Sequence, residues 1–322
     1  MRAIETESLT KDYSVGFWRP RPYRALDSLS LQVETGEVFG FLGPNGAGKT
    51  TTLKLLTELI YPTSGRISVL GKSPSHPDVR RRAGYLPEAP YFYDYLSAEE
   101  LLTYFGGLFG LRGEERRRRV AGLLDKVGLG GERRLPLRKY SKGMLQRVGL
   151  AQALVNEPEL VFLDEPMSGL DPLGRRDVRA LILELRDKGC TVFFSSHILS
   201  DAEALCSRVA IVVGGQLVTA GRLSDILAFE VSGWELVMSG LAPETAAGLG
   251  NRARSVTRIS EGRYTVELAP EVAPERLIAE LRAAGGGLVS LSPVRTTLED
   301  YFVQQVTARK GAPPPGRVMP EG

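Results

Sequence analysis

Short apolar runs separated by turn residues dominate the first third of the chain. Such runs are typical of β-strands, and they cover Arg2–Glu7, Leu29–Val33, Glu37–Leu42 and Arg66–Leu70. Between the last two runs, apolar residues recur at intervals of three and four over Lys49–Ile60. This spacing predicts a helix with one buried face.

The middle of the chain changes from helical to mixed patterns. From about Tyr91 to Asn156, Leu and Val recur every three or four residues, which predicts a helical insertion. Strand-like runs return at Leu160–Leu163 and Thr191–Ser195, separated by a helical pattern over Gly174–Asp187. Strands that alternate with helices indicate a parallel sheet with crossover helices. We therefore expect an α/β domain over residues 1–225, with a helical subdomain at about 91–156.

The composition changes again after Gly221. Strand patterns occupy Trp234–Met238, Ser255–Ile259 and Arg263–Leu268, and a helical pattern follows at Pro274–Ala284. These elements predict a small α+β domain over residues 226–309. The tail, residues 310–322, combines Pro, Gly and charge with little to bury, so we expect it to be disordered.

Composition excludes several classes of function. The formal net charge is only +3, from 41 basic and 38 acidic residues, so no extended basic face of a nucleic-acid binder is expected. The basic run Glu115–Val120 predicts a solvated helix face. No apolar run reaches the roughly 20 residues of a membrane span, and no signal peptide is evident, which predicts a cytoplasmic protein. Cys190 and Cys206 lie in apolar segments and are expected to be buried thiols.

A phosphate-binding motif follows the strand that ends at Leu42. Residues Gly43–Thr50, GPNGAGKT, match GxxxxGK[ST] between a strand and a helix, as this loop requires. Glycines let the backbone amides converge on phosphate oxygens, and the helix N-terminus adds its positive end. The predicted nucleotide ligands are Gly43, Pro44, Asn45, Gly46, Ala47, Gly48, Lys49, Thr50 and Thr51. Lys49 is expected to reach the β- and γ-phosphates, and Thr50 to ligate Mg²⁺.

Two acids follow the strand Leu160–Leu163. Asp164 and Glu165 fall at the carboxyl edge of the predicted sheet, where phosphate ligands bind in such folds. Asp164 suits the Mg²⁺ shell, and Glu165 suits a base that accepts a proton from the attacking water or orients it. The alternative is a solvated acidic turn.

Here the residues resemble the ABC ATPase family, over Met1–Gly221. The family signature is close to LSGGQ followed by QR, and this chain has YSKGMLQRV at Tyr140–Val148. It departs at Tyr140, Lys142 and Met144. The resemblance implies a P-loop NTPase of the ABC ATPase type that binds ATP and Mg²⁺, with an antiparallel β subdomain. It also implies that the signature residues Ser141, Lys142, Gly143 and Met144 act on a second copy, which makes a homodimer. Ser141 and the Gly143 amide would bind the γ-phosphate that this second copy holds. An ordinary helix N-cap at Ser141 is the alternative.

Three further segments carry the resemblance. SGLD, Ser168–Asp171, is similar to the D-loop, which implies that Asp171 couples the two sites. SSH, ending at His197, is similar to the switch motif, so His197 would contact the γ-phosphate and position Glu165 and water. Tyr13 is similar to the aromatic that stacks on adenine. The segment Gly16–Arg24 offers Phe17, Trp18 and Tyr23 as rivals, and is expected to form an exposed hairpin tip rather than a lipid contact.

The main departure from the family lies at the Q-loop. Glu88 stands where the family commonly has Gln, a residue that touches Mg²⁺ and moves with the transmembrane partner. The aromatic cluster Tyr91, Phe92, Tyr93 and Tyr95 follows it. By resemblance this cluster lies beside the groove for the membrane subunit's coupling helix, and local packing is the alternative.

The resemblance implies an ATPase subunit that powers export through separate transmembrane permease subunits, bound peripherally at the inner face of the membrane. The segment Thr297–Val306 resembles a closing helix of exporter-type subunits. A soluble ABC ATPase with a non-transport partner is one alternative, and a regulatory adaptor is another. No nucleic-acid partner is expected, and the cargo is left open because the transmembrane subunit contacts it.

Replacing Glu88 with Gln should relax the Mg²⁺ requirement of ATP hydrolysis. A carboxylate binds the metal more strongly than an amide but repels the γ-phosphate when the metal is missing. As Mg²⁺ is lowered below saturation, the activity of Glu88→Gln relative to the parent chain should therefore rise. An activity ratio that stays constant across the Mg²⁺ titration would count against this role.

Overall fold

The computed structural model describes residues 1–16, 21–227, 231–295 and 297–302. The chain divides into two compact units, Met1–Leu223 and Ser224–Gly322. A short helix, α8 (Leu223–Ile226), spans the boundary in sequence. The division lies two residues before the expected boundary at 225 and 226.

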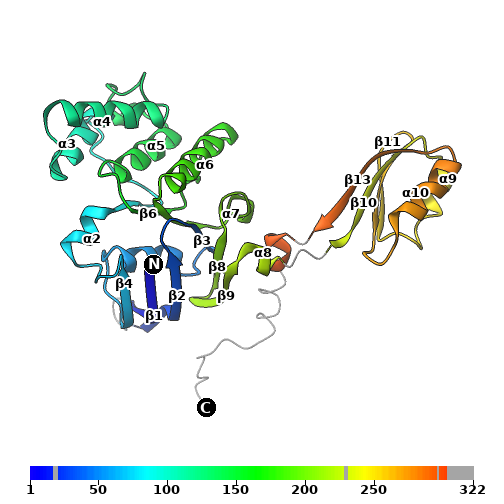
Figure 1. Cartoon of the computed structure of the whole chain (residues 1–322), viewed down its shortest axis with the longest axis horizontal. Coiled ribbons are helices and arrows are strands. Elements are labelled where there is room, and N and C mark those ends of the chain that lie inside the picture. Colours follow the sequence, from blue (N-terminus) through cyan, green and yellow to red (C-terminus); the bar gives the residue numbers. More distant parts are fainter. Residues whose placement is uncertain (17–20, 228–230, 296, 303–322) are drawn as a thin grey trace, which may run out of the picture. The chain divides into compact units, whose positions relative to one another are not determined.

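A six-stranded sheet forms the centre of the first unit (Figure 1). Its strands, in spatial order, are β5 (Ala83–Leu86), β6 (Leu160–Asp164), β7 (Thr191–Ser196), β3 (Val38–Leu42), β8 (Arg208–Val213) and β9 (Gln216–Arg222). The first five are parallel, and β9 pairs antiparallel at the edge. Strands β3, β6 and β7 are buried along their whole length, as expected for a sheet covered on both faces. The predicted α/β class is confirmed.

Alternate residues of β3 show which elements cover each face. Phe39 and Phe41 pack into a core that includes Leu53 of α1 (Lys49–Leu56). A Cβ added to Gly40, between them, would lie 3.6 Å from the Cβ of Ala202 in α7 (Leu199–Leu205). Helix α6 (Pro172–Asp187) contacts α7, β3 and β7. One face of the sheet therefore packs on α1 and the other on α7.

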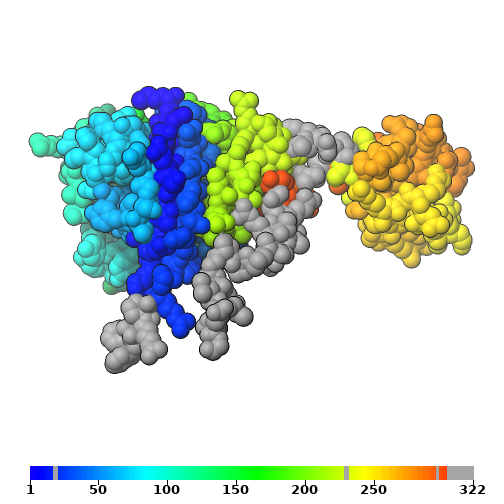
Figure 2. Space-filling model, turned by 90° about the horizontal axis from the view of Figure 1, so that it is seen from below, coloured from blue at the N-terminus to red at the C-terminus, as the bar shows by residue number. Residues whose placement is uncertain are grey.

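An antiparallel sheet covers the α1 side of this core. It consists of β2 (Arg21–Glu34), β1 (Arg2–Val15) and β4 (Ser64–Val69), in that order. Figure 2 shows the β1–β2 ribbon, in blue, between the cyan segment that contains α2 and the yellow-green β8–β9 segment. Both β1 and β2 are much longer than predicted, because their far ends pair with each other in an exposed hairpin and so lack the apolar pattern of a strand.

The expected helical insertion is present within residues 91–156. It comprises α3 (Ala98–Leu108), α4 (Gly113–Lys126), a 3-10 turn at Leu137–Lys139 and α5 (Lys142–Ala153). Ser97 and Glu100 form a reciprocal capping box that starts α3. The basic residues Arg117 and Arg118 of α4 are exposed, as a solvated helix face requires, whereas Arg116 and Arg119 are partly buried.

Several elements differ from the sequence-based expectations. Helix α1 ends at Leu56 rather than Ile60, and Glu58 follows in the left-handed region at φ 56°. Helix α2 (Pro77–Arg82) and strands β8 and β9 were not predicted. Helix α2 is too short to show a helical period, so its sequence carried little signal.

The described part of the second unit contains a four-stranded antiparallel sheet and the helices α9 (Pro243–Ala247) and α10 (Pro274–Ala283). The strand order is β11 (Ser255–Ser260), β12 (Arg263–Leu268), β10 (Val231–Ser239) and β13 (Gly287–Arg295). The core contains Leu236, Tyr264, Val266, Leu277 and Leu281. Strand β13 and α9 were not predicted, but the α+β class is as expected.

The C-terminal segment is described only in part. The side chains of Thr297 and Asp300 exchange capping hydrogen bonds with each other's backbone N–H groups, which fits the start of the helix expected over Thr297–Val306. The rest of that helix and the expected disordered tail, residues 310–322, lie outside the described residues.

Truncating Phe193 should destabilise the first unit strongly. Its ring is fully buried, with centroids 5.7, 5.4 and 6.0 Å from those of Phe39, Phe41 and Phe162. Phe193→Ala should lower the free energy of unfolding by about 3–5 kcal/mol, since it removes buried contacts and leaves a cavity. Urea-dependent hydrogen exchange in β3 and β7 measures this unit separately from the second. Leu173→Ala, at a side chain that is 61% exposed, is the matched control. Equal effects of the two variants would contradict the assignment of the core.

Candidate active site

The loop between β3 and α1 winds tightly against neighbouring backbone. A Cβ on Gly43 would lie 2.3 Å from the carbonyl oxygen of Val212, and one on Gly48 would lie 2.7 Å from that of Ala25. Gly46 and Gly48 also have φ of 79° and 101°, which disfavour any side chain. Glycine is therefore required at these positions for steric reasons.

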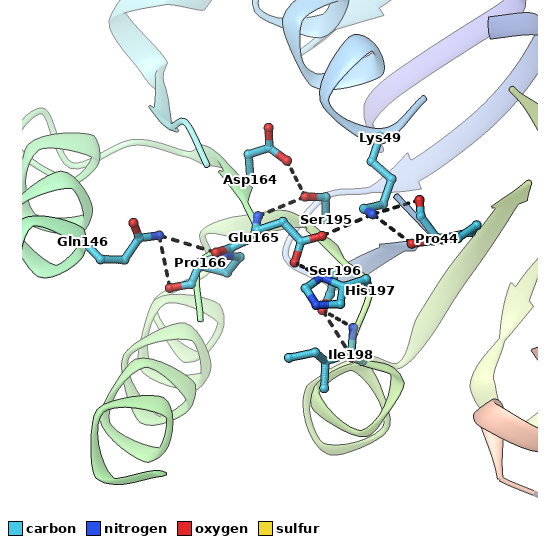
Figure 3. A network of polar contacts seen from close by, with 11 residues as sticks. Pro44, Lys49, Gln146, Asp164, Glu165, Pro166, Ser195, Ser196, His197 and Ile198 are labelled. Atoms are coloured by element: carbon cyan, nitrogen blue, oxygen red, sulfur yellow. Dashed lines mark hydrogen bonds and ion pairs between the residues drawn. The ribbon is translucent and has the colours of Figure 1, made fainter. Parts of the chain in front are cut away.

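The ammonium group of Lys49 is folded back over this loop. It donates to the carbonyl oxygens of Gly43 at 2.8 Å and Pro44 at 3.3 Å, and lies 3.2 Å from Oε1 of Glu165 (Figure 3). The side chains of Lys49 and Glu165 are both 7% exposed. An anion that enters the loop therefore meets a positive charge that is already positioned there.

A cavity of about 460 Å³ opens over the loop. Its lining contains every predicted nucleotide ligand except Gly43, whose carbonyl instead holds Lys49. The cavity is lined by Tyr13, Tyr23, Ala25, Pro44, Asn45, Gly46, Ala47, Gly48, Lys49, Thr50, Thr51, Glu88 and Glu165. The structure thus gathers the loop, the expected aromatic residue and two of the expected acids around one space.

Glu165 is the most constrained residue of the site. Its Oε2 lies 2.8 Å from Nδ1 of His197, while Oε1 faces Lys49. Its backbone is left-handed, with φ 49°, and its N–H donates to Oγ of Ser195 at 3.0 Å. A non-glycine residue in this region is strained, and persists only where its surroundings hold it. The carboxylate is therefore held between a cation and an imidazole at the edge of the cavity.

Asp164, one residue earlier, is fully buried, and only one of its two carboxylate oxygens has a hydrogen-bond partner among the described residues. Its Oδ1 accepts a hydrogen bond of 2.6 Å from Ser195, whereas Oδ2 has no partner among the described residues. Burial raises the pKa of Asp164, while the hydroxyls of Ser195 and Thr50 act in the opposite direction. A buried carboxylate oxygen without a partner, beside a threonine hydroxyl, suits a divalent cation.

The described residues do not form a complete metal cage. In the part of the chain that the structure describes, no three His, Cys, Asp or Glu side chains are grouped to hold a metal. A cation at Asp164 and Thr50 would therefore need oxygen ligands from a bound molecule, as Mg²⁺ commonly does at phosphate sites.

Two polar residues of the site were not predicted to act in it. Ser195 bridges both acids, since it donates to Asp164 and accepts from the N–H of Glu165. Gln146 of α5 is 3% exposed, and its amide donates to the carbonyls of Glu165 and Pro166 at 3.4 and 3.3 Å. The only sequence signal for Ser195 is a hydroxyl at the end of an otherwise apolar strand, and Gln146 was noted only for its resemblance to the family motif.

The segment resembling the signature lies at a second cavity. This cavity, of about 430 Å³, is lined by Ser141, Lys142, Gly143, Met144 and Asp171, among others, and shares no lining residue with the first. Ser141 is the N-cap of α5 and accepts from the N–H of Met144 at 3.2 Å. Asp171 caps α6 by accepting from Gly174 at 2.7 Å. One chain therefore brings the signature and D-loop segments together, but not onto its own phosphate loop.

The remaining expected residues are surface features. Tyr13 pairs directly with Tyr23 across β1 and β2, and both line the first cavity. Phe17 and Trp18, the other aromatic candidates for stacking on adenine, lie outside the described residues. Glu88 is exposed at the cavity margin, and Tyr91 beyond it is 95% exposed.

The two cysteines are buried, as expected. Burial raises the pKa of Cys190 to about 12, and raises that of Cys206 further. Both thiols are therefore protonated and unreactive at neutral pH.

Comparison with known proteins decides the family. The sequence model of the ABC transporter family matches residues 26–168. An uncharacterized ABC transporter ATP-binding protein of Synechocystis is 46% identical over 310 residues, which cover 95% of this chain and 85% of that protein. The chain belongs to the ABC transporter family. It is an ATP-binding subunit with ATPase activity, and none of its described helices is long and apolar enough to cross a membrane.

Other relatives of this ABC transporter subunit agree. The bacitracin transport ATP-binding protein of Bacillus licheniformis is 41% identical over 217 residues, 66% of this chain and 68% of that protein. A dimeric ATP-binding cassette in a post-hydrolysis state, bound to ADP and Pi, has a TM-score of 0.63 and 26% identity, and covers 68% of this chain and 98% of that one. The ABC ATPase fold expected from the sequence is confirmed.

Replacing Ser195 with Ala should impair ATP hydrolysis by the subunit. The change leaves a buried carboxylate oxygen of Asp164 and the N–H of Glu165 without partners. Hydrogen bonds to charged groups contribute about 1.5–3 kcal/mol, so kcat should fall roughly 10- to 150-fold if the loss is felt in the transition state. Steady-state ATPase assays measure this, with the exposed Ser200→Ala as control. Normal kcat in a folded Ser195→Ala protein would refute the role of Ser195.

Proposed function

We propose that this subunit is the ATP-driven motor of an exporter, in which two copies bind and hydrolyse ATP while attached to separate transmembrane subunits at the cytoplasmic face of the membrane. The observation that carries the proposal is the placement of Glu165. Its carboxylate lies between Lys49 and His197, at 3.2 and 2.8 Å, at the edge of the phosphate-loop cavity.

The phosphate loop binds the triphosphate through charge and backbone amides. Lys49, the loop N–H groups and the N-terminus of α1 converge on one point, where they stabilise the charge of the transferring phosphoryl group. Thr50 and Asp164 would hold Mg²⁺, with Glu88 near them, and the metal would neutralise phosphate charge. The unpartnered Oδ2 of Asp164 supports this assignment.

Glu165 and His197 act on the attacking water. The water oxygen bonds to the γ-phosphorus, the bond to the β–γ bridging oxygen breaks, and the products are ADP and phosphate. Glu165 orients the water and accepts its proton, and His197 fixes the carboxylate through Oε2 and contacts the γ-phosphate. The left-handed backbone and the Ser195 contact keep the carboxylate directed into the cavity.

A second copy supplies the other half of each site. The phosphate-loop cavity and the cavity lined by residues 141–144 share no lining residue, so one chain does not close its own site. In a head-to-tail dimer, Ser141 and the N-terminus of α5 would meet the γ-phosphate of the partner copy, with Asp171 between the two sites. The dimeric state of the cassette bound to ADP and Pi supports this arrangement.

Attachment to a membrane subunit is supported by an exposed aromatic surface beyond Glu88. Tyr91, Tyr93 and Tyr95 are 95%, 61% and 64% exposed, and the rings of Tyr93 and Tyr95 lie 5.8 Å apart. Exposed apolar patches of this kind are typical of interaction surfaces. Export is inferred from the resemblance to exporter-type subunits, and the bacitracin transport protein is a relative with a transport role in its name.

Glu165→Gln should separate nucleotide binding from hydrolysis. The amide keeps the shape of the side chain but does not accept the water's proton, so ATP turnover should fall about 100-fold or more. MgATP binding should persist. The ATP-bound dimer should accumulate, because it is no longer dissociated by hydrolysis of the bound ATP.

Turnover is measured by phosphate release, and the dimer by size-exclusion chromatography with light scattering. Glu184→Gln, which alters a partly exposed carboxylate paired with Lys126 and Lys188 outside the cavity, is the control and should keep full activity. Undiminished hydrolysis by Glu165→Gln would remove Glu165 from the mechanism.

A further inference from the structure

Tyr23 lies directly opposite Tyr13 in the antiparallel ladder of β1 and β2. Directly opposed residues of such a ladder point to the same face, with Cβ atoms about 5 Å apart. Both tyrosines line the phosphate-loop cavity, and Tyr23 is 51% exposed. Two aromatic rings therefore border the same part of the cavity, although the family resemblance assigns a role to Tyr13 alone.

The ring of Tyr13 is already contacted by a cation. The ammonium of Lys11 lies 5.2 Å from the ring centroid and is held by a 2.7 Å hydrogen bond to the carbonyl of Tyr61. An ammonium over an aromatic ring is attracted to the π-face it contacts, so part of the Tyr13 ring is engaged within the protein. Among the described residues, no ammonium or guanidinium group lies over the ring of Tyr23, which presents half of its surface to solvent.

The strand that carries Tyr23 also supports the phosphate loop. Ala25, two residues after Tyr23 in β2, also lines the cavity, and its carbonyl packs so closely on Gly48 that a Cβ there would lie 2.7 Å away. Two residues along a strand span roughly 7 Å. The distance between the Tyr23 ring and the loop is therefore set by one short stretch of backbone.

The next rung of the ladder fixes this register. Asp12 pairs with Arg24, whose Nε and Nη2 atoms donate to its two carboxylate oxygens at 2.9 and 3.2 Å. A fork-to-fork contact of this kind constrains geometry more than a single hydrogen bond does. It lies on the opposite face of the ribbon from the tyrosines and holds the two strands at the rung beside them.

We propose that Tyr23 is a second aromatic contact for the nucleotide base, so that the base of ATP is bound by a two-tyrosine wall rather than by Tyr13 alone. The inference rests on the assignment of the first cavity as the ATP site. Stacking of a base on an aromatic ring uses the π-face and needs no particular hydrogen-bonding edge. The ring of Tyr23, and not its hydroxyl, therefore makes the contact.

Equilibrium binding to the full chain tests this with two probes, MgATP and inorganic tripolyphosphate with Mg²⁺, which lacks the base. Tyr23→Thr removes the ring and keeps a β-branched side chain suited to a strand. It should weaken MgATP binding about 10-fold and leave tripolyphosphate binding within about twofold of the parent. Tyr23→Phe should bind both as the parent does, and Tyr104→Ala, at an exposed tyrosine outside the cavity, is the control.

Each outcome has a separate meaning. If Tyr23→Thr binds MgATP as tightly as the parent chain, Tyr23 does not contact the base and this inference is wrong. If both probes weaken equally, Tyr23 supports the phosphate loop instead, which also overturns it. Failure of the parent chain itself to bind MgATP more tightly than Lys49→Ala would instead refute the proposed function of the cavity.

Discussion

A single buried carboxylate links the parts of this site. Glu165 is 6% exposed, and its charge is tolerated there because the Lys49 ammonium and the His197 imidazole both contact it. Removing one partner of a buried ion pair is strongly destabilising, since an uncompensated charge stays behind. The same ammonium is the group that a phosphate in the loop needs. The bound phosphate and the carboxylate of Glu165 therefore compete for the Lys49 ammonium. This competition couples nucleotide binding to the position of the general base, Glu165.

The sheet order explains how distant segments form this contact. Strands β6, β7 and β3 are neighbours and parallel, so Glu165, His197 and the phosphate loop follow three adjacent carboxyl ends. Residues more than 100 positions apart then lie within hydrogen-bonding distance. Ser195, near the end of β7, hydrogen-bonds to Asp164, the last residue of β6, and to Glu165, which follows it.

The sequence predicted the local motifs well, because each carries its own pattern. The phosphate loop, the acids after β6 and the histidine after β7 all follow apolar runs that identify their strands. The two-tyrosine wall was less visible, because the outer halves of β1 and β2 are polar and exposed, and only their pairing with each other makes them strands. Gln146 and Ser195 act through contacts between separate elements, for which the sequence has no local signal.

The proposed mechanism requires a second copy at each site, and one measurement tests this directly. Ser141→Arg, introduced into the Glu165→Gln chain, places a bulky cation at the start of α5, outside the lining of that chain's own phosphate-loop cavity. With MgATP, light scattering should show that the ATP-dependent dimer is lost, while nucleotide binding to the monomer is unchanged. A dimer that persists, or a monomer that no longer binds ATP, would contradict a site shared between two copies.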